Sequence, residues 1–370
     1  MIRLFLLGLI VMIGSSHSFG QVYSNKEVGK KNTDAIDSLK NSEYPYVLPI
    51  WGKKATALGF KLPLSAGLGL NYLWQESDLV INNLKIGFNG GTLYSLDDII
   101  RFNNAISRTN SINFRPDFWL FPFLNVYGIF AKTEASTNVD FTVYVPNGTG
   151  FTEVETFNTE AVFDATTAGF GITPTIGIGG GWMALDMNFT WSDIAELEKP
   201  AFSFVFGPRF GKSLKLKNPE SNIALWVGGF RVKLNSGTNG SLPLADFIPD
   251  NNLNDRINNG LEKVGDAQSM LTDWWNNLTP LEQAQNLVKY QAANAAIGKV
   301  NDFLINASDA LNGIANSSVE YSLDKKQKNM WNFVIGSQYQ INPRWMIRAE
   351  GGFLGSRTQF LGGLQYRFGL

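Results

Sequence analysis

The stretch Trp182-Met-Ala-Leu-Asp-Met-Asn-Phe-Thr-Trp191 decides the fold, because its side chains alternate between two classes. Successive side chains of a β-strand point to opposite faces, so a period of two predicts a strand between an apolar and a polar environment. The same alternation recurs at residues 112–118, 202–209 and 331–340. In the first stretch the apolar face carries Met183, Leu185, Met187, Phe189 and Trp191, and the other face carries Ala184, Asp186, Asn188 and Thr190.

The composition limits the environments in which these strands can lie. Of the 370 residues only 17% are charged, with 31 Lys+Arg against 32 Asp+Glu and no Cys. A soluble domain carries about 25% charged residues, and a nucleic-acid-binding chain usually carries a basic excess. Beyond residue 20 the chain has no run of about 18 apolar residues, which a transmembrane helix would need. We therefore expect no nucleic-acid partner and no membrane-spanning helix.

The alternating strands predict an all-β transmembrane antiparallel β-barrel, with a secreted β-sandwich as the alternative. The first predicted strand has Gly67, Gly69 and Asn71 on its polar face, which suits a crowded or watery lumen. Aromatic residues stand at the ends of the apolar faces, like the girdles of membrane barrels: Trp191, Trp331, Tyr339 and Trp345. Both observations favour the barrel.

Residues 1–20 have the features of a secretory signal peptide. Arg3 is basic, residues 4–13 form an apolar core, and small residues lead to cleavage near Gly20. The apolar core is about half as long as the ~20 residues that a membrane anchor needs. Cleavage also removes the only histidine, His17, so the mature chain has neither His nor Cys. We therefore expect no enzyme activity, no catalytic residue, no metal site and no cofactor.

The C-terminal strand ends in a distinctive pattern. Gly363 is followed by Tyr366 and Phe368, two aromatic residues that share one face of the strand. This order resembles the signal by which Gram-negative outer-membrane β-barrels are recognised for insertion, although Leu361 occupies the slot of a polar residue. The resemblance covers the signal peptide, the strand pattern and this last strand, and it matches no characterised subfamily. It implies location in the cell outer membrane, with outer-membrane lipids and the barrel-insertion machinery as partners.

Eleven stretches are predicted to be strands, one short of the even number found in single-chain bacterial barrels. A further strand is expected at Tyr46–Trp51, although Trp51–Leu58 also fits a short helix that ends before Gly59. We therefore predict about 12 strands, with ten or fourteen as alternatives. The eleven strands are residues 65–75, 78–88, 111–120, 124–145, 151–178, 182–191, 200–215, 222–234, 330–340, 344–354 and 357–369. The predicted domains are a signal peptide 1–20, an N-terminal segment 21–64, barrel strands 65–250, a helical-hairpin insertion 251–320 and C-terminal barrel strands 321–370.

The long loop 235–329 contains the predicted helical hairpin. Apolar residues at steps of three and four run from Leu253 to Leu278, and again from Ile297 to Ile314. Between the two helices, Thr279-Pro-Leu-Glu282 forms a capping box with Pro at the first helical position. The plainest interpretation is that the helices bury their apolar stripes against each other, and the alternative is that part of a stripe meets the lumen, lipid or a partner. A periplasmic C-terminus places this loop outside the cell.

Ten polar or charged residues are candidates for the lumen face: Arg115, Asp117, Asp186, Asn188, Arg209, Arg231, Lys233, Arg348, Glu350 and Arg367. Their mixed charges suit either the field of a narrow pore or a network that neutralises itself in a closed barrel.

Three functions follow from this architecture. The leading hypothesis is a channel or transporter for small solutes. A second is uptake of hydrophobic compounds gated by the external helices, by architectural analogy with long-chain fatty acid transporters. The third is a surface interaction or structural barrel whose hairpin docks a partner. A continuous apolar pocket under the hairpin would favour uptake of hydrophobic compounds, whereas free Trp274 and Trp275 would favour docking.

Overall fold

The computed structural model describes residues 37, 40, 43–178, 180–195, 197, 199–218, 220–234, 237–244, 252–312 and 317–370. The predicted signal peptide and its cleavage site near Gly20 lie outside this part of the chain. Among the described residues, no helix has the length and apolar character needed to cross a membrane.

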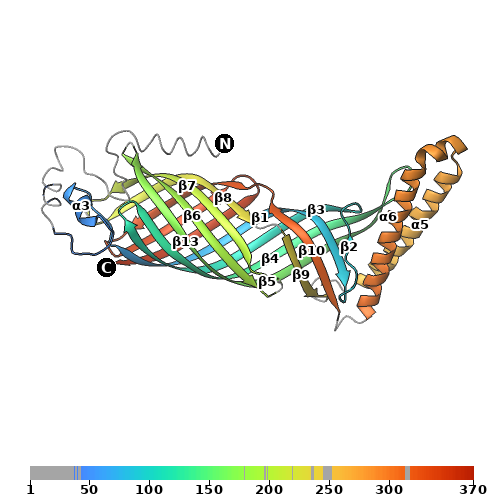
Figure 1. The fold of residues 1–370 in the computed structure, drawn as a ribbon, viewed down its shortest axis with the longest axis horizontal. Helices are drawn as coiled ribbons and strands as arrows, with labels where there is room; N and C mark the ends of the chain where they lie inside the picture. Colours follow the sequence, from blue (N-terminus) through green and yellow to red (C-terminus); the bar gives the residue numbers. More distant parts are fainter. Residues whose placement is uncertain are drawn as a thin grey trace.

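Ten strands form a closed antiparallel β-barrel, in which each strand pairs with its neighbours (Figure 1). The last strand closes the barrel on the first, with Ala66 opposite Phe368 and Ser77 opposite Arg357. All backbone hydrogen-bonding groups of a closed sheet are paired between strands, which is the condition for crossing a bilayer. The strands are β1 (Ala66–Phe88), β3 (Ile100–Phe121), β4 (Leu124–Pro146), β5 (Phe151–Ile178), β6 (Gly181–Ile194), β7 (Ala201–Lys215), β8 (Asn222–Leu234), β11 (Trp331–Gln340), β12 (Trp345–Phe353) and β13 (Arg357–Phe368).

The barrel has ten strands, the smaller of the two alternatives to the predicted number of about 12. Residues 65–75 and 78–88 are one continuous strand of 23 residues rather than two. The polar residues between them do not form a turn: Glu76 pairs with Arg108 of β3 at 2.7 Å, on the outer surface. The strand expected at Tyr46–Trp51 is absent too, because these residues form no regular element and are followed by the helix α3 (Gly52–Ala57). Gly59 follows it with a φ of 84°, as the helical alternative required.

Four strands continue far beyond the barrel and form what we call the extension. β1, β3, β4 and β5 have 22 to 28 residues, whereas a transmembrane strand needs about 9–11. The extension consists of their outer parts together with β2 (Tyr94–Ser95), β9 (Gly237–Pro243) and β10 (Ser318–Gln327). β10 pairs with the outer half of β1, from Leu79 opposite Gln327 to Phe88 opposite Val319. The domain boundary predicted at residue 320 therefore falls inside a strand.

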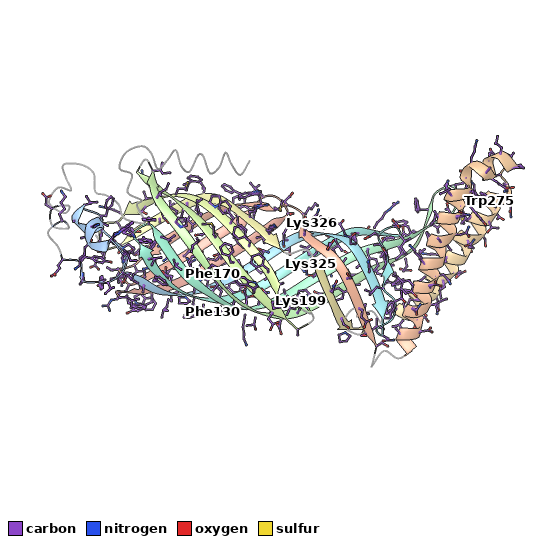
Figure 2. All side chains as sticks on the ribbon, viewed as in Figure 1. Phe130, Phe170, Lys199, Trp275, Lys325 and Lys326 are labelled. Carbon is purple, nitrogen blue, oxygen red and sulfur yellow. The ribbon has the colours of Figure 1, made fainter. Side chains whose placement is uncertain are left out.

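The polarity of the sheet inverts between the barrel and the extension. On β5 the side chain of Phe170 points outward from the barrel, where it is 48% exposed, and stacks on Phe189 of β6 at 5.2 Å. Ten and twelve residues earlier, Glu160 and Asn158 point outward from the extension, while Phe157 points inward and is buried. A strand with an apolar outer face suits lipid, and a strand with an apolar inner face suits water outside. Figure 2 shows Phe130 and Phe170 on the barrel.

The helices α5 (Leu253–Asn276) and α6 (Pro280–Asn312) form a hairpin at the far end of the extension (Figure 1). The capping box between them is formed: the backbone N–H of Thr279 donates to Glu282 at 2.8 Å. The hairpin buries its apolar stripes against the extension as well as within itself. The shared core includes Val264, Leu271, Val300 and Leu304 of the helices and Val143, Val145, Val154 and Phe157 of the strands.

The opposite end of the barrel is covered by residues 43–64, which include α3 (Figure 1). The backbone N–H of Ile50 donates to Leu120 at 2.9 Å, and that of Val47 donates to Leu370 at 2.8 Å. These bonds fix the segment to the ends of β3 and of the C-terminal strand. The two ends of the barrel are thus covered by different parts of the chain.

Candidate functional site: a filled lumen below an apolar cavity

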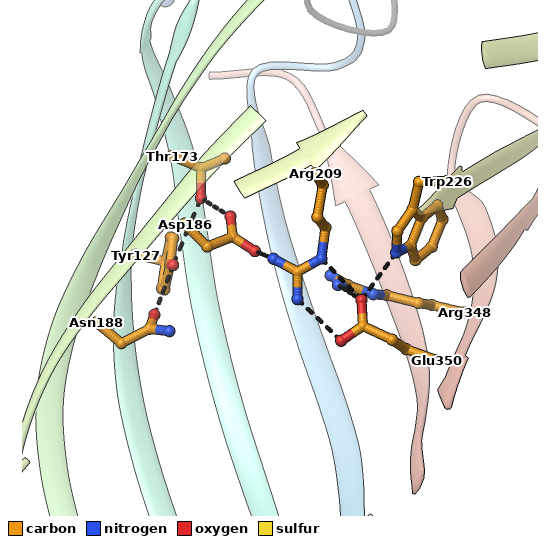
Figure 3. A network of polar contacts seen from close by, with 8 residues as sticks. All are labelled: Tyr127, Thr173, Asp186, Asn188, Arg209, Trp226, Arg348 and Glu350. Atoms are coloured by element: carbon orange, nitrogen blue, oxygen red, sulfur yellow. Dashed lines mark hydrogen bonds and ion pairs between the residues drawn. The ribbon is translucent and has the colours of Figure 1, made fainter. Parts of the chain in front are cut away.

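Arg209 of β7 is the centre of an ion-pair network in the lumen (Figure 3). Its Nε donates to Glu350 of β12 at 2.7 Å, and its Nη2 donates to the other carboxylate oxygen at 2.9 Å. Its Nη1 contacts Asp186 of β6. The Glu350 side chain, 1% exposed, also accepts from Trp226 Nε1 at 2.8 Å and from Arg348 Nη2 at 3.3 Å. This bidentate, buried arrangement bridges strands on different sides of the lumen and holds them together.

Glycines make room for the large side chains of this network. A Cβ on Gly336 would lie 2.3 Å from the Trp226 ring, and one on Gly211 would lie 2.3 Å from Trp182. The two indole rings lie 6.1 Å apart. The small residues that alternate with apolar ones along the barrel strands therefore serve the packing of the lumen.

A second polar cluster lies nearer the end that α3 covers. Arg367 Nη1 pairs with Asp117 at 3.1 Å, and Asn125 donates to the same carboxylate at 2.9 Å. Arg367 Nε donates to the backbone carbonyl of Leu64 at 3.0 Å, which connects the cluster to the N-terminal segment. The side chains of both Arg367 and Asp117 are at most 5% exposed.

The lumen retains a polar cavity of about 90 Å³, which has room for about three waters. Arg115 lies over the Tyr127 ring at 3.5 Å in its wall, and the Tyr127 hydroxyl donates to Asn188 at 2.6 Å. Side chains thus fill most of the space inside the ten strands, in the way expected for a small barrel.

Two of the predicted lumen residues are on the wrong face. Arg231 lies opposite Phe206 and Trp331, and Lys233 lies opposite Phe204, all of which point outward. On β8 the lumen face carries Trp226, so residues an odd number of positions away face out. The other eight candidates have their side chains in the lumen: Arg115, Asp117, Asp186, Asn188, Arg209, Arg348, Glu350 and Arg367.

The residues of the predicted insertion signal lie on the strand that closes the barrel. Tyr366 and Phe368 stack on the outer face with ring centroids 6.3 Å apart, and Trp345 lies 4.9 Å from Tyr366. Gly363 faces Asn71 of β1, and a Cβ there would overlap the Asn71 amide. The aromatic pair thus faces outward, and the glycine permits close strand pairing.

The extension encloses an apolar cavity of about 90 Å³ that the sequence analysis missed. Five strands line it, with Ile86, Phe102, Phe141 and Phe163 among the apolar residues, and Lys325 as the only charged one. One of these strands, β10, falls within the long loop predicted at residues 235–329. However, Val319, Tyr321, Leu323 and Lys325 of β10 alternate with Glu320, Ser322, Asp324 and Lys326, and this alternation indicates a strand.

A smaller cavity of about 30 Å³ lies directly under the helical hairpin. It shares Ile86 and Phe141 with the larger one, so the apolar interior continues from the junction with the barrel to the hairpin. The two tryptophans of α5 are engaged: Trp275 stacks on Tyr290 at 4.3 Å, and Trp274 packs on Gly148. Apolar space therefore lies under the hairpin, but as two adjacent cavities and not as the continuous pocket expected for hydrophobic uptake. The free tryptophans expected for docking are not found.

Between the lumen network and the apolar cavity lies a group of buried polar side chains. Arg357 of β13 is 3% exposed, and none of its three guanidinium nitrogens has a hydrogen-bond partner among the described residues. The guanidinium carbon of Arg357 lies 5.6 Å from the centre of the Phe230 ring. The amide of Asn332, next to Phe230 across the strands, likewise has no partner there. These groups form the outer end of the lumen.

No protein-family model matches the chain, and no curated protein matches its sequence. Among solved structures, the β domain of the Bordetella autotransporter BrkA is similar at 8% identity, over 82% of this chain and 100% of that one, with a TM-score of 0.33. The transport unit of the autotransporter AIDA-I from Escherichia coli is similar at 9% identity, over 93% of this chain and 100% of that one, with a TM-score of 0.32. The toluene transporter TbuX from Ralstonia pickettii is similar at 10% identity, over 94% of this chain and 100% of that one, with a TM-score of 0.28. At these scores the similarity assigns no function, and the barrel rests on the strand pairing of this chain.

Proposed function

We propose that this protein is an outer-membrane transporter that captures small apolar solutes outside the cell. The outward apolar side chains of the barrel support a place in lipid, and the inverted polarity of the extension supports a place in water. The C-terminus and α3 would then lie at the periplasmic end, and the hairpin outside. Residues 1–20 would direct export, and Gly363, Tyr366 and Phe368 would serve recognition by the insertion machinery.

The apolar cavity of the extension is the observation that carries this proposal. It lies on the outer side of the lumen, so a solute that enters it is in line with the barrel interior. Its lining, which is mostly apolar, favours transfer of an apolar solute from water, since burial contributes about 25 cal/mol per Å². A polar solute would lose its hydration there without replacement.

The ion-pair network acts in this proposal as a closed gate. Arg209, Asp186 and Glu350 occupy the lumen between the cavity and the periplasmic end, so passage requires them to separate or shift. The filled lumen favours the closed, self-neutralising alternative over a permanently open pore. Recordings across planar bilayers should accordingly show no steady conductance for the unmodified protein.

The test is uptake of radiolabelled naphthalene by porin-deficient cells that express the protein. Ala161→Trp places an indole in the cavity and should abolish the uptake that expression adds, whereas Val162→Trp places it on the water-facing side of the same strand and should not. Both variants must reach the membrane in equal amounts. Equal uptake by the two variants would contradict the proposal.

A second candidate function is docking of a partner on the hairpin, which two residues of α6 favour. Leu281 is 70% exposed and Val288 is 78% exposed, one helical repeat of seven apart. Leu281→Glu with Val288→Glu would remove this apolar patch without touching the cavity. If the hairpin only docks a partner, these changes should leave naphthalene uptake unchanged, and Ala161→Trp should also leave it unchanged.

A further inference from the structure

The apolar cavity contains one cationic side chain, and its place in the fold is unusual. Lys325 of β10 points into the cavity, where its Nζ lies 5.4 Å from the centre of the Phe163 ring. Its neighbour Lys326 points outward and is exposed. Figure 2 places both where the barrel passes into the extension. The cavity is therefore apolar along its walls and cationic at one point.

Among the described residues, the Lys325 ammonium has no anionic partner. Within that part of the chain it forms no hydrogen bond and no ion pair, and none of the residues that line the cavity is acidic. Asp324, the nearest acid in sequence, faces out and accepts a hydrogen bond from Asn83 at 2.6 Å. Burial lowers the pKa of Lys325 below its ordinary value, because the charged form is poorly solvated there. In the lumen, by contrast, Arg209, Arg348 and Arg367 each meet a carboxylate.

We infer that the captured solute is an apolar monocarboxylate, whose carboxylate pairs with Lys325 while its apolar body fills the cavity. This inference rests on the proposed function and specifies its substrate class. A carboxylate supplies the charge that the ammonium lacks, and the cation–π contact with Phe163 leaves ammonium hydrogens free to donate. A neutral apolar solute would leave the ammonium uncompensated, and an amine would repel it.

The chain also provides a next position for the carboxylate on the way to the lumen. Along β1, Ile81 lies opposite Lys325, Leu79 opposite Gln327, and Ser77 opposite Arg357. These three β1 residues are buried on the same inner face. The unpaired guanidinium of Arg357 therefore lies about four residues, roughly 13 Å, further along the strand. A carboxylate released by Lys325 would meet Arg357 before it reaches the Arg209 network.

The test compares three ligands that share a six-carbon chain and differ in the head group. Hexanoate, hexan-1-ol and hexylamine are titrated by calorimetry into the full chain in nanodiscs, with empty nanodiscs as the blank. Hexanoate should bind roughly ten- to hundredfold more tightly than hexan-1-ol, the range expected for a charge-assisted hydrogen bond, and hexylamine should bind least. Equal affinity for hexanoate and hexan-1-ol in the unmodified protein overturns the inference.

Variants identify the residue responsible. Lys325→Met should reduce hexanoate affinity to that of hexan-1-ol and leave the alcohol unaffected, Lys325→Arg should retain the preference, and Lys326→Met should behave as the unmodified protein. A preference that survives Lys325→Met overturns the assignment to Lys325. If hexan-1-ol binds but hexanoate has no advantage, the inference fails and the proposed capture of apolar solutes stands. If none of the three ligands binds, the proposed function fails as well.

Discussion

Replacement of Glu350 by Gln tests whether the ion-pair network holds the lumen closed. The variant keeps the shape of the side chain and removes the charge that Arg209 meets at 2.7 and 2.9 Å and Arg348 meets at 3.3 Å. Arg209 and Arg348 then share one nearby acid, Asp186. The site is buried, since the Arg209 and Glu350 side chains are 8% and 1% exposed. Removing one partner of a buried pair destabilises a protein by about 3–5 kcal/mol.

The control is Glu76→Gln, which removes one partner of an ion pair on the outer surface. Arg108 and Glu76 meet at the same 2.7 Å, but their side chains are 58% and 38% exposed. Solvent screens such a pair, so its loss should cost at most about 1 kcal/mol. The two substitutions are chemically identical and differ only in burial.

The assay is urea unfolding of each variant in lipid vesicles, followed by tryptophan fluorescence and extrapolated linearly to zero denaturant. Glu350→Gln should lower the free energy of unfolding by several times the effect of Glu76→Gln. The same vesicles, fused to a planar bilayer, should show opening events for Glu350→Gln only, because Arg209 and Arg348 repel each other once the carboxylate is neutral. Equal stability losses, with no opening events, would refute the gate.

Three further predictions concern the outer surface, the hairpin and the last strand. In the same urea assay, Phe170→Arg should destabilise the protein by about 2–4 kcal/mol if the residue lies near the bilayer midplane. Val162→Arg also points outward from this strand but lies in the extension, so it should change the free energy of unfolding by less than about 0.5 kcal/mol. Replacing residues 252–312 by a Gly-Ser linker should leave a heat-modifiable barrel, because the backbone groups of Leu244 and Ser317 already hydrogen-bond at 2.9 Å and the cost of loop closure depends weakly on length. Binding of a hydrophobic dye should then increase, because the deletion uncovers the core at Val143 and Val154. Failure of the deleted chain to assemble would show that the hairpin is needed for barrel folding. Tyr366→Ala with Phe368→Ala should slow insertion and expose the chain to periplasmic proteolysis, and normal outer-membrane levels would contradict a signal role.

The sequence predicted the barrel strands well because a single rule governs them. An apolar outer face and a packed, largely polar lumen produce the period of two at Met187/Asn188 and at Phe189/Thr190, and the structure places these faces as expected. The same rule located eight of the ten lumen candidates. It failed at Arg231 and Lys233 because a basic residue near the outer end of a strand also suits the water-facing outer surface, and composition alone does not separate the two cases.

The extension was harder to predict because the rule reverses along the strand. Thr173 and Ala161 both point inward from β5, yet the first meets polar lumen groups and the second lines an apolar cavity. An alternating pattern tells which face points inward only while the polarity of the surroundings stays the same. Here the outer face changes from apolar to polar in mid-strand. The reversal also conceals the continuity of β1 across the polar Glu76, and the strand character of β10. Lys325 and Arg357 could not be predicted because their surroundings come from strand pairings between residues distant in sequence.

Access of an apolar solute to the cavity is tested most directly by cysteine protection. The chain has no Cys, so a single cysteine at Ala161 reports on the cavity and one at Val162 reports on the outer surface of the same strand. A small maleimide is reacted with each variant in intact membranes at increasing concentrations of hexan-1-ol. The account predicts that hexan-1-ol slows modification at position 161 in a saturable manner and leaves position 162 unchanged. Equal rates at position 161 with and without the alcohol would contradict it.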